Sequence, residues 1–250
     1  MFKLINFSLK ALIIILISSL ILIFSAFFYF SSGLPDYKKL SDYQPPISSR
    51  VYSKDGKLIA EYALEKRLFV PYDSIPRKVI NAFLSAEDKN FFNHPGVDAK
   101  GIIRATVNNI KNILGDKRLE GASTITQQVA KNFLLTNEVS LKRKIKEAIL
   151  AFRIEKAYSK KRILELYLNQ IYLGQGTYGV AAASNRYFKK SLEDLDLSEV
   201  SFLAALPKAP SRYNPKKNYD KSLSRRNWVL KRMFINNHIT EDDYNNFVKT

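Results

Sequence analysis

The sequence contains no cysteine and only two histidines, His94 and His238, in 250 residues. The absence of cysteine excludes disulfide scaffolds, zinc ribbons, iron–sulfur sites and thiol nucleophiles. The two histidines are 144 residues apart (238 − 94), and neither belongs to an H-E-x-x-H motif. A histidine-based metal centre is therefore not expected.

Acidic residues are also scarce, since 23 Asp and Glu stand against 40 Lys and Arg, a net charge of +17. Hydrophobic residues nevertheless make up 46% of the chain and aromatic residues 12%, which excludes a disordered chain. The length allows one or two domains with a sizeable buried core. The basic balance favours a polyanionic partner: nucleic acid, anionic lipid or a phosphorylated substrate.

Residues 11–30 form a long uncharged run, ALIIILISSLILIFSAFFYF. Twenty helical residues of about 1.5 Å each span the hydrocarbon core of a bilayer, about 30 Å thick, so the run predicts one transmembrane helix. Lys3 and Lys10 precede it without an acidic residue, which predicts a cytoplasmic tail over 1–10 and an extracytoplasmic remainder. That topology argues against nucleic acid as a partner and favours an anionic membrane surface.

Beyond this run, residues 31–49 contain three prolines and no apolar period, which predicts a linker. Alternating residues around Asp55-Gly56 predict a short β-hairpin within 50–70. From residue 76 onward the apolar period is helical. The expected helices cover 76–91, 99–114, 123–135, 139–157, 160–172, 176–187, 197–206, 220–236 and 240–248. The predicted fold class is therefore mainly α.

Glu87 interrupts the apolar stripe of helix 76–91, because it follows Ile80 at i+7, Phe83 at i+4 and Leu84 at i+3. A carboxylate on a buried face has a raised pKa, which is how an enzyme prepares a general acid or base for neutral pH. The alternative is a structural glutamate that is paired with a buried arginine or an unsatisfied backbone N–H. The sequence alone leaves both interpretations open.

Two later helices carry polar groups that could hold an anion. In GASTITQQ (121–128), Ser123 is expected to cap a helix whose polar stripe runs from Thr124 through Gln127 and Gln128 to Lys131. In helix 139–157, Arg143 and Glu147 lie one turn apart, and Leu141 and Phe152 are expected in its buried stripe. Each helix could equally be an amphipathic surface helix with a solvated charged face.

The segments resemble the family 51 glycosyltransferases, the peptidoglycan polymerases of the bacterial cell envelope. The matching stretches, in the family's order, are EDKNFFNHPG (87–96), GASTITQQVAKNF (121–133), RKIKEA (143–148), KRILELYLNQIYLG (161–174) and YGVAAASNRYF (178–188). LPKAPSRYNP (206–215) and RRNWVLKRM (225–233) resemble the N-terminal part of class A penicillin-binding proteins. The chain has no S-x-x-K and no K-T-G motif, so transpeptidase activity is not expected of these 250 residues.

The resemblance implies a lysozyme-like, mainly helical domain over 50–235 with a smaller membrane-proximal lobe, and a linker that begins within 236–250. It implies polymerisation of lipid II with inversion at the anomeric carbon and release of undecaprenyl diphosphate, in the cytoplasmic (inner) membrane. Other cell-wall synthesis proteins are implied as partners.

The resemblance also assigns roles. Glu87 matches the catalytic base, and Glu147 matches a second glutamate beside the donor's diphosphate. The basic residues that would hold this leaving group are Lys131, Arg143 and Lys146. The residues that would line the cleft are Ser123, Thr124, Gln127 and Gln128, and those that would shape the surroundings of the base are Asp88, Phe91 and His94.

The chain departs from the family at Val139, where many relatives carry a basic residue before the hydroxyl residue that opens the helix. One diphosphate contact is then lost or supplied by Lys142, and weaker donor binding is expected. No cofactor is required by the sequence, although the resemblance allows a divalent cation, Mg²⁺ or Mn²⁺, at Asp88 or at the diphosphate.

Two rival functions and two local roles are left open. One rival is a membrane-anchored glycan hydrolase of lysozyme-like fold, with Glu87 as general acid. The other is a non-catalytic scaffold whose basic face binds anionic lipid. Helix 99–114, with Ile103, Val107 and Ile110 in its stripe, is expected to pack against the core, with contact to the membrane interface as the alternative. The loop 115–120 is expected to be mobile around an entering substrate.

Overall fold

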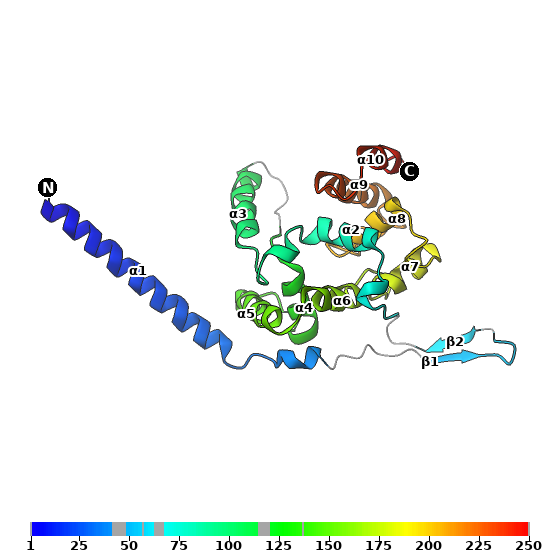
Figure 1. Ribbon diagram of the computed structural model, residues 1–250, viewed down its shortest axis with the longest axis horizontal. Coiled ribbons are helices and arrows are strands. Elements are labelled where there is room, and N and C mark those ends of the chain that lie inside the picture. Colours follow the sequence, from blue (N-terminus) through cyan, green and yellow to red (C-terminus); the bar gives the residue numbers. More distant parts are fainter. Residues whose placement is uncertain are drawn as a thin grey trace.

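The computed structural model describes residues 2–41, 49–56, 58–62, 68–114, 121–136 and 138–249. The predicted mainly α class is confirmed (Figure 1). The helices of the body are α2 (Arg77–Glu87), α3 (Ala99–Leu114), α4 (Ile125–Leu134), α5 (Leu141–Ala157), α6 (Lys160–Gln170), α7 (Val180–Phe188), α8 (Leu197–Ala205), α9 (Tyr219–Ile235) and α10 (Glu241–Phe247). Short 3₁₀ turns are η1 (Tyr37–Leu40), η2 (Tyr72–Ser74) and η3 (Phe91–Asn93). The loop 115–120 lies outside the described residues.

The N-terminal helix α1 (Phe2–Ser31) extends away from this body, with the N-terminus at its far end (Figure 1). Its last residue, Ser31, accepts a hydrogen bond at Oγ from Arg153 of α5. The turn η1 is held in the same region, because the hydroxyl of Tyr158, the C-cap of α5, donates to the carbonyl oxygen of Tyr37 at 3.1 Å. The transmembrane span predicted over 11–30 falls within α1. Within the described residues no helix is both long and apolar enough to be a membrane span, so that prediction is not confirmed.

Two strands, β1 (Ser49–Tyr52) and β2 (Leu58–Tyr62), lie where the sequence predicts a hairpin. They pair antiparallel, with Ser49 opposite Tyr62 and an irregularity between Val51 and Tyr52. Figure 1 shows the pair projecting from the body on the side opposite to α1. The strands therefore add no layer to the helical core.

Helix α2 is the centre of the core, between the pair α4 and α6 and the pair α8 and α9 (Figure 1). Its apolar stripe is completely buried at Val79 and Phe83, and the ring of Phe83 meets that of Tyr167 on α6 edge to face at 6.2 Å. Burying an aliphatic or aromatic side chain of this size contributes about 1.5–3 kcal/mol. Because α2 is held on both sides, its C-terminal residue Glu87 has a fixed position.

Three helix boundaries differ from the predictions for identifiable reasons. Helix α2 ends at Glu87 rather than at 91, since Asp88 leaves the helical conformation at φ −158° and ψ 76°. Helix α4 begins at Ile125, because Thr124, not Ser123, is its N-cap. Helix α7 begins at Val180 rather than at 176, after Gly179 at φ +82°, where a Cβ would lie 2.6 Å from the carbonyl oxygen of Asn169. Only glycine fits that turn.

Several predicted core positions are wrong. Leu141 is 78% exposed and Phe152 is 42% exposed, so they do not belong to a buried stripe of α5. Helix α3 was expected to pack on the core, yet Ile103, Val107 and Ile110 are all exposed. In Figure 1, α3 stands out from the body on the same side as α1. Apolar periodicity identifies an apolar face of a helix, but burial of that face depends on whether another element packs against it.

Candidate active site

Glu87 lies at the C-terminal end of α2, half-buried beneath α4. Its Oε2 accepts a hydrogen bond from Gln128 Nε2 at 2.8 Å. Burial raises the pKa of the Glu87 carboxyl above its ordinary value of 4.5, against opposing effects of the Gln128 hydrogen bond and the positive charges of Arg225 and Lys208. A carboxylate with a raised pKa and one fixed hydrogen bond is suited to take up a proton near neutral pH.

Asp88 and His94 fix the chain that follows Glu87. Asp88 is buried, and its Oδ2 accepts a hydrogen bond at 3.0 Å from the backbone N–H of Ile125, the first residue of α4. Both carboxylate oxygens of Asp88 lie 3.0 Å from His94 Nε2. Since His94 Nδ1 accepts from the backbone N–H of Gly96 at 3.1 Å, Nε2 carries the hydrogen and donates it to Asp88. These contacts join the end of α2 to the start of α4.

The residues at the start of α4 divide into two groups. Thr124 and Gln127 form a capping box and are 2% and 4% exposed, and the Thr124 hydroxyl donates to the Gly96 carbonyl oxygen at 2.6 Å. Ser123 lies on the other side and accepts a hydrogen bond from Lys144 Nζ at 2.6 Å. Ser123 and Gln128 therefore contact charged side chains, those of Lys144 and Glu87, whereas Thr124 and Gln127 cap the start of the helix.

Glu147 on α5 is 2% exposed and is held by two cations of its own helix. It accepts hydrogen bonds from Arg143 Nη1 and, at 2.7 Å, from Lys144 Nζ. The position of Glu147 therefore orients both cations. Such a fixed arrangement suits recognition of a phosphate better than a solvated lysine would.

Lys131, Arg143 and Lys144 form a cationic cluster, the name used below. Burial and the charge of Arg143 lower the pKa of Lys131, and burial, Arg143 and Lys131 lower the pKa of Lys144. Binding of an anion relieves the repulsion among these charges. The charge of Glu87 acts in the opposite direction on Lys131, which places the cluster within electrostatic reach of the carboxylate.

The roles that the resemblance assigns to Lys146, beside the leaving group, and to Phe91, around the base, stay predictions. Lys146 is half-buried, and its side chain makes no hydrogen bond or ion pair with any residue of the described ranges. Phe91 is 0% exposed in the core, with Lys160 Nζ 4.4 Å above its ring. Val139, the departure from the family pattern, is 94% exposed just before Ser140, the N-cap of α5.

Sequence reasoning gave Lys144 only a supporting place beside Arg143 and Glu147, and it missed Arg225 and Lys208, whose charges lower the pKa of Glu87 against the effect of burial. Lys144 carried a signal, because its position three residues before Glu147 puts both on one face of the helix. Arg225 carried no such signal, although the structure buries it to 8% exposure. Nothing local marks Lys208, which lies in the segment between α8 and α9.

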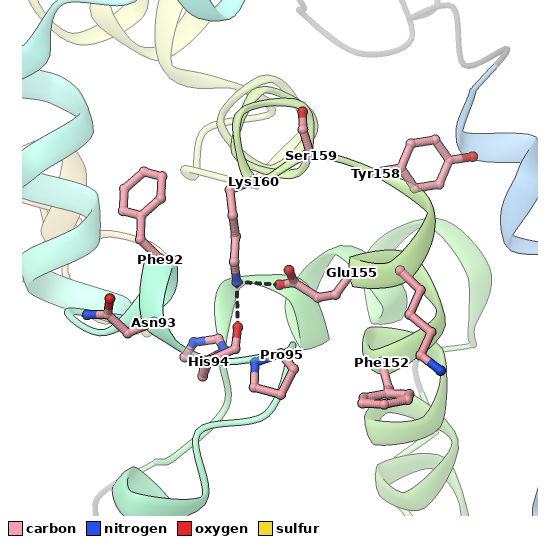
Figure 2. A pocket seen from close by; sticks show the side chains of 10 residues that line it. Phe92, Asn93, His94, Pro95, Phe152, Glu155, Tyr158, Ser159 and Lys160 are labelled. Carbon is pink, nitrogen blue, oxygen red and sulfur yellow. Dashed lines mark hydrogen bonds and ion pairs between the residues drawn. The ribbon is translucent and has the colours of Figure 1, made fainter.

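A separate surface pocket of about 610 Å³ lies between η3, the C-terminal end of α5 and the start of α6. Figure 2 shows Phe92 at one edge, Phe152 at another, and Lys160 across the middle. Lys160 Nζ donates to Glu155 Oε1 at 2.8 Å and to the His94 carbonyl oxygen at 2.7 Å. Because Glu87 and the cationic cluster are absent from its lining, this pocket is not the candidate active site.

A divalent cation does not fit at Asp88. Both of its oxygens are occupied by N–H donors, from His94 and Ile125, and the side chain is buried. Across the described ranges, no group of three or more Asp, Glu or His side chains is arranged to hold a metal ion.

Comparison with known proteins places the chain in a family. The model of the transglycosylase family matches residues 55–234. Penicillin-binding protein 1A of Rickettsia felis is 54% identical over 242 residues, which cover 97% of this chain and 31% of the relative. Penicillin-binding protein 1A of Rickettsia prowazekii is 57% identical over 215 residues, 86% of this chain and 27% of the relative. The matched part of the chain thus spans 27–31% of the length of these relatives.

A crystal structure of penicillin-binding protein 1A from Haemophilus influenzae is 29% identical, with a TM-score of 0.47, and covers 83% of this chain and 21% of that one. The family match over most of the chain and the high identity to the Rickettsia proteins agree with each other. The chain belongs to the transglycosylase family, the family 51 glycosyltransferases, and corresponds to the peptidoglycan glycosyltransferase domain of a class A penicillin-binding protein.

Proposed function

We propose that the chain polymerises lipid II into glycan strands, with Glu87 as the base and the cationic cluster as the site of the donor's diphosphate. The observation that carries the proposal is that Glu87, a carboxylate of raised pKa, lies within electrostatic reach of the cationic cluster, whose positive charges repel one another. Two carboxylates without cations would instead suit hydrolysis. A diphosphate is already a good leaving group, so neutralising its charge replaces protonation by an acid.

The proposed step is a single displacement. Glu87 accepts the proton of the 4-hydroxyl on the acceptor sugar, and the resulting oxygen nucleophile attacks C1 of the growing chain. The bond between C1 and the diphosphate oxygen breaks, and its electron pair leaves with undecaprenyl diphosphate. Lys131, Arg143 and Lys144 stabilise the charge that develops on this leaving group, and Glu147 orients two of them. Attack opposite the leaving group inverts the anomeric carbon.

A membrane location follows from the same proposal, because the substrate is lipid-linked. The uncharged run 11–30 within α1 and the exposed apolar face of α3 support anchoring of the chain with its catalytic domain on the extracytoplasmic side. The absence of natural cysteine allows a direct test with single cysteines introduced at Ser8 and Ser32. A membrane-impermeant thiol reagent added outside should label position 32 and not position 8, and the reverse pattern would overturn the topology.

We further propose that the glycosyltransferase unit is lysozyme-like with a membrane-proximal lobe and covers 50–235, which the family match over 55–234 supports. The helix α10 packs on α9, where the rings of Phe234 and Tyr244 stack at 5.6 Å. A linker within 236–250 and contacts with other cell-wall synthesis proteins stay predictions.

The function is tested by incubating the purified chain with labelled lipid II and separating the products by size. Glycan strands and released undecaprenyl diphosphate are expected. Reducing ends released from intact peptidoglycan, with lipid II left unconsumed, would instead identify a hydrolase. Binding to anionic vesicles with neither reaction would leave only the scaffold function.

Replacing Lys144 by methionine tests the role of the cationic cluster. We expect kcat/KM for lipid II to fall roughly 10- to 100-fold, since a hydrogen bond to a charged group is worth about 1.5–3 kcal/mol and about 1.4 kcal/mol is tenfold. The matched control is Lys156→Met, at an exposed position near the other end of α5, which should keep the wild-type rate. Equal rates for the two variants would remove Lys144 from the site.

A further inference from the structure

Lys160, the first residue of α6, is a lysine whose ammonium group is fixed in place. Its side chain is only 22% exposed, and Nζ donates to the His94 carbonyl oxygen at 2.7 Å and to Glu155 Oε1 at 2.8 Å (Figure 2). Nζ also lies 4.4 Å from the centre of the Phe91 ring. A solvated lysine samples many rotamers, whereas these three contacts hold the side chain in one position. Two of the three, to His94 and Phe91, are to the segment that follows Glu87.

His94 transmits this restraint to the residue beside the base. Its backbone carbonyl oxygen is held by Lys160, and its ring donates from Nε2 to Asp88 at 3.0 Å. The backbone N–H of Gly96 donates to the other ring nitrogen at 3.1 Å, so both nitrogens have partners and the ring has one orientation. Asp88 is the C-cap of α2 and directly follows Glu87 in the chain. A shift of the His94 backbone therefore displaces Asp88 and the end of α2.

The same contacts reach the Glu87 carboxylate from α4. Asp88 Oδ2 accepts a hydrogen bond from the backbone N–H of Ile125, at the start of α4. Three residues further along, Gln128 donates to Glu87 Oε2 at 2.8 Å. The carboxylate is thus held through its backbone by α2 and through one oxygen by α4, and Asp88 joins the two helices. Small errors matter here, because a misplacement of about 1 Å can cost roughly 10²-fold in rate.

We infer that Lys160 is a positioning residue for the reaction, which keeps the Glu87 carboxylate in place through the contacts of His94. The inference rests on the proposed function of Glu87 as the base. Lys160 touches neither substrate nor reacting atoms in this role, since it lines the separate surface pocket, from which Glu87 and the cationic cluster are absent. Binding of lipid II by the cationic cluster should therefore not depend on Lys160.

Separate measurements of kcat and KM for lipid II distinguish positioning from substrate binding. For Lys160→Met we expect kcat to fall roughly 10- to 100-fold, because the base is misplaced. KM should stay within about twofold of the wild type, because the cationic cluster is unchanged. The control is Lys161→Met at the next residue of α6, where the side chain is 65% exposed and pairs with the exposed Asp73, and it should keep both constants.

A double-mutant cycle with Glu87→Gln distinguishes positioning from a general loss of structure. A residue that acts through Glu87 has nothing to position once the base is absent. Lys160→Met should therefore lower the residual rate of Glu87→Gln by less than about twofold. A residue that merely supports the fold lowers the rate by the same factor in both backgrounds. Equal factors, or a wild-type kcat in Lys160→Met, overturn the inference.

Three further variants complete the design. Lys160→Arg keeps the charge and the N–H donors, and the pocket of about 610 Å³ beside it has room for the larger side chain. This variant should keep kcat within about threefold of the wild type, and a kcat as low as that of Lys160→Met would overturn the role of the donors. In Glu155→Gln the amide oxygen can still accept from Lys160, so that variant leaves the lysine in place. If Lys160→Met does not fold, Lys160→Gln, which is uncharged and one atom shorter, replaces it in the cycle.

The failure of this inference is distinguishable from failure of the proposed function. A slow Glu87→Gln variant, combined with equal effects of Lys160→Met in both backgrounds, rejects only the role of Lys160. A fully active Glu87→Gln variant rejects Glu87 as the base, and the role of Lys160 falls with it.

Discussion

Replacing Glu87 by glutamine is expected to lower the rate of lipid II polymerisation by roughly 10²- to 10⁴-fold, the usual contribution of a general base. Glutamine has nearly the same size and can still accept the hydrogen bond from Gln128 through its amide oxygen. It cannot accept the proton of the acceptor hydroxyl at neutral pH. The initial rate of glycan strand formation from labelled lipid II measures the effect.

The stability of the Glu87→Gln variant separates lost chemistry from lost structure. Burial raises the pKa of Glu87 in the folded state above 4.5, so the carboxyl contributes stability at low pH that is lost as the pH rises through the folded-state pKa. Glutamine does not titrate, so the variant should unfold at the same temperature as the wild type, or a higher one, at pH 7. A lowered unfolding temperature would mean that Glu87 is a structural residue.

A second glutamate provides the matched control for this experiment. Glu155 on α5 is also half-buried and hydrogen-bonded, to Thr126 Oγ1 at 2.5 Å and Lys160 Nζ at 2.8 Å, but lies outside the candidate active site. Glu155→Gln should keep polymerisation within a few-fold of the wild type. Equal losses in Glu87→Gln and Glu155→Gln would contradict the assignment of the base.

Most of the helices could be predicted from the sequence, because an apolar stripe in each is long enough to show its period. Their ends could not be placed as well, since tertiary contacts set them. Helix α2 ends at Glu87 because Asp88 turns to bind His94 and Ile125, which are 6 and 37 residues further along the chain. The exposure of α3 and Leu141 is likewise a property of the assembled fold, and no pattern within one helix records it.

The same distinction applies to the candidate site. Glu87 was found because a carboxylate interrupts its own helix's apolar stripe, which is local information. Lys146 was preferred to Lys144 because the resemblance pointed to it, yet Lys144 is the lysine that contacts Glu147 and Ser123. Arg225 could not be found by periodicity, since its effect on Glu87 depends on how α9 lies against α2.

The largest loss of stability is expected from Asp88→Ala. The variant leaves the His94 Nε2–H and the Ile125 N–H buried without acceptors, and it opens the connection between the end of α2 and the start of α4. A buried donor that loses its acceptor costs about 1–3 kcal/mol in the free energy of unfolding, and this variant leaves two such donors. Denaturant unfolding of the purified chain, followed by the loss of helical circular dichroism, measures this cost.

An exposed aspartate, Asp73, provides the control for this test. Asp73 pairs with Lys161 at 3.4 Å, with side chains 86% and 65% exposed, and Asp73→Ala should change the free energy of unfolding by less than about 1 kcal/mol. Asp88→Asn should lie between the two, because the amide oxygen can accept from Ile125 while its NH₂ group then faces the His94 N–H. If Asp88→Ala were as stable as Asp73→Ala, the junction of α2 and α4 would not depend on this carboxylate. Glu87 would then owe its position to the packing of Val79 and Phe83 alone.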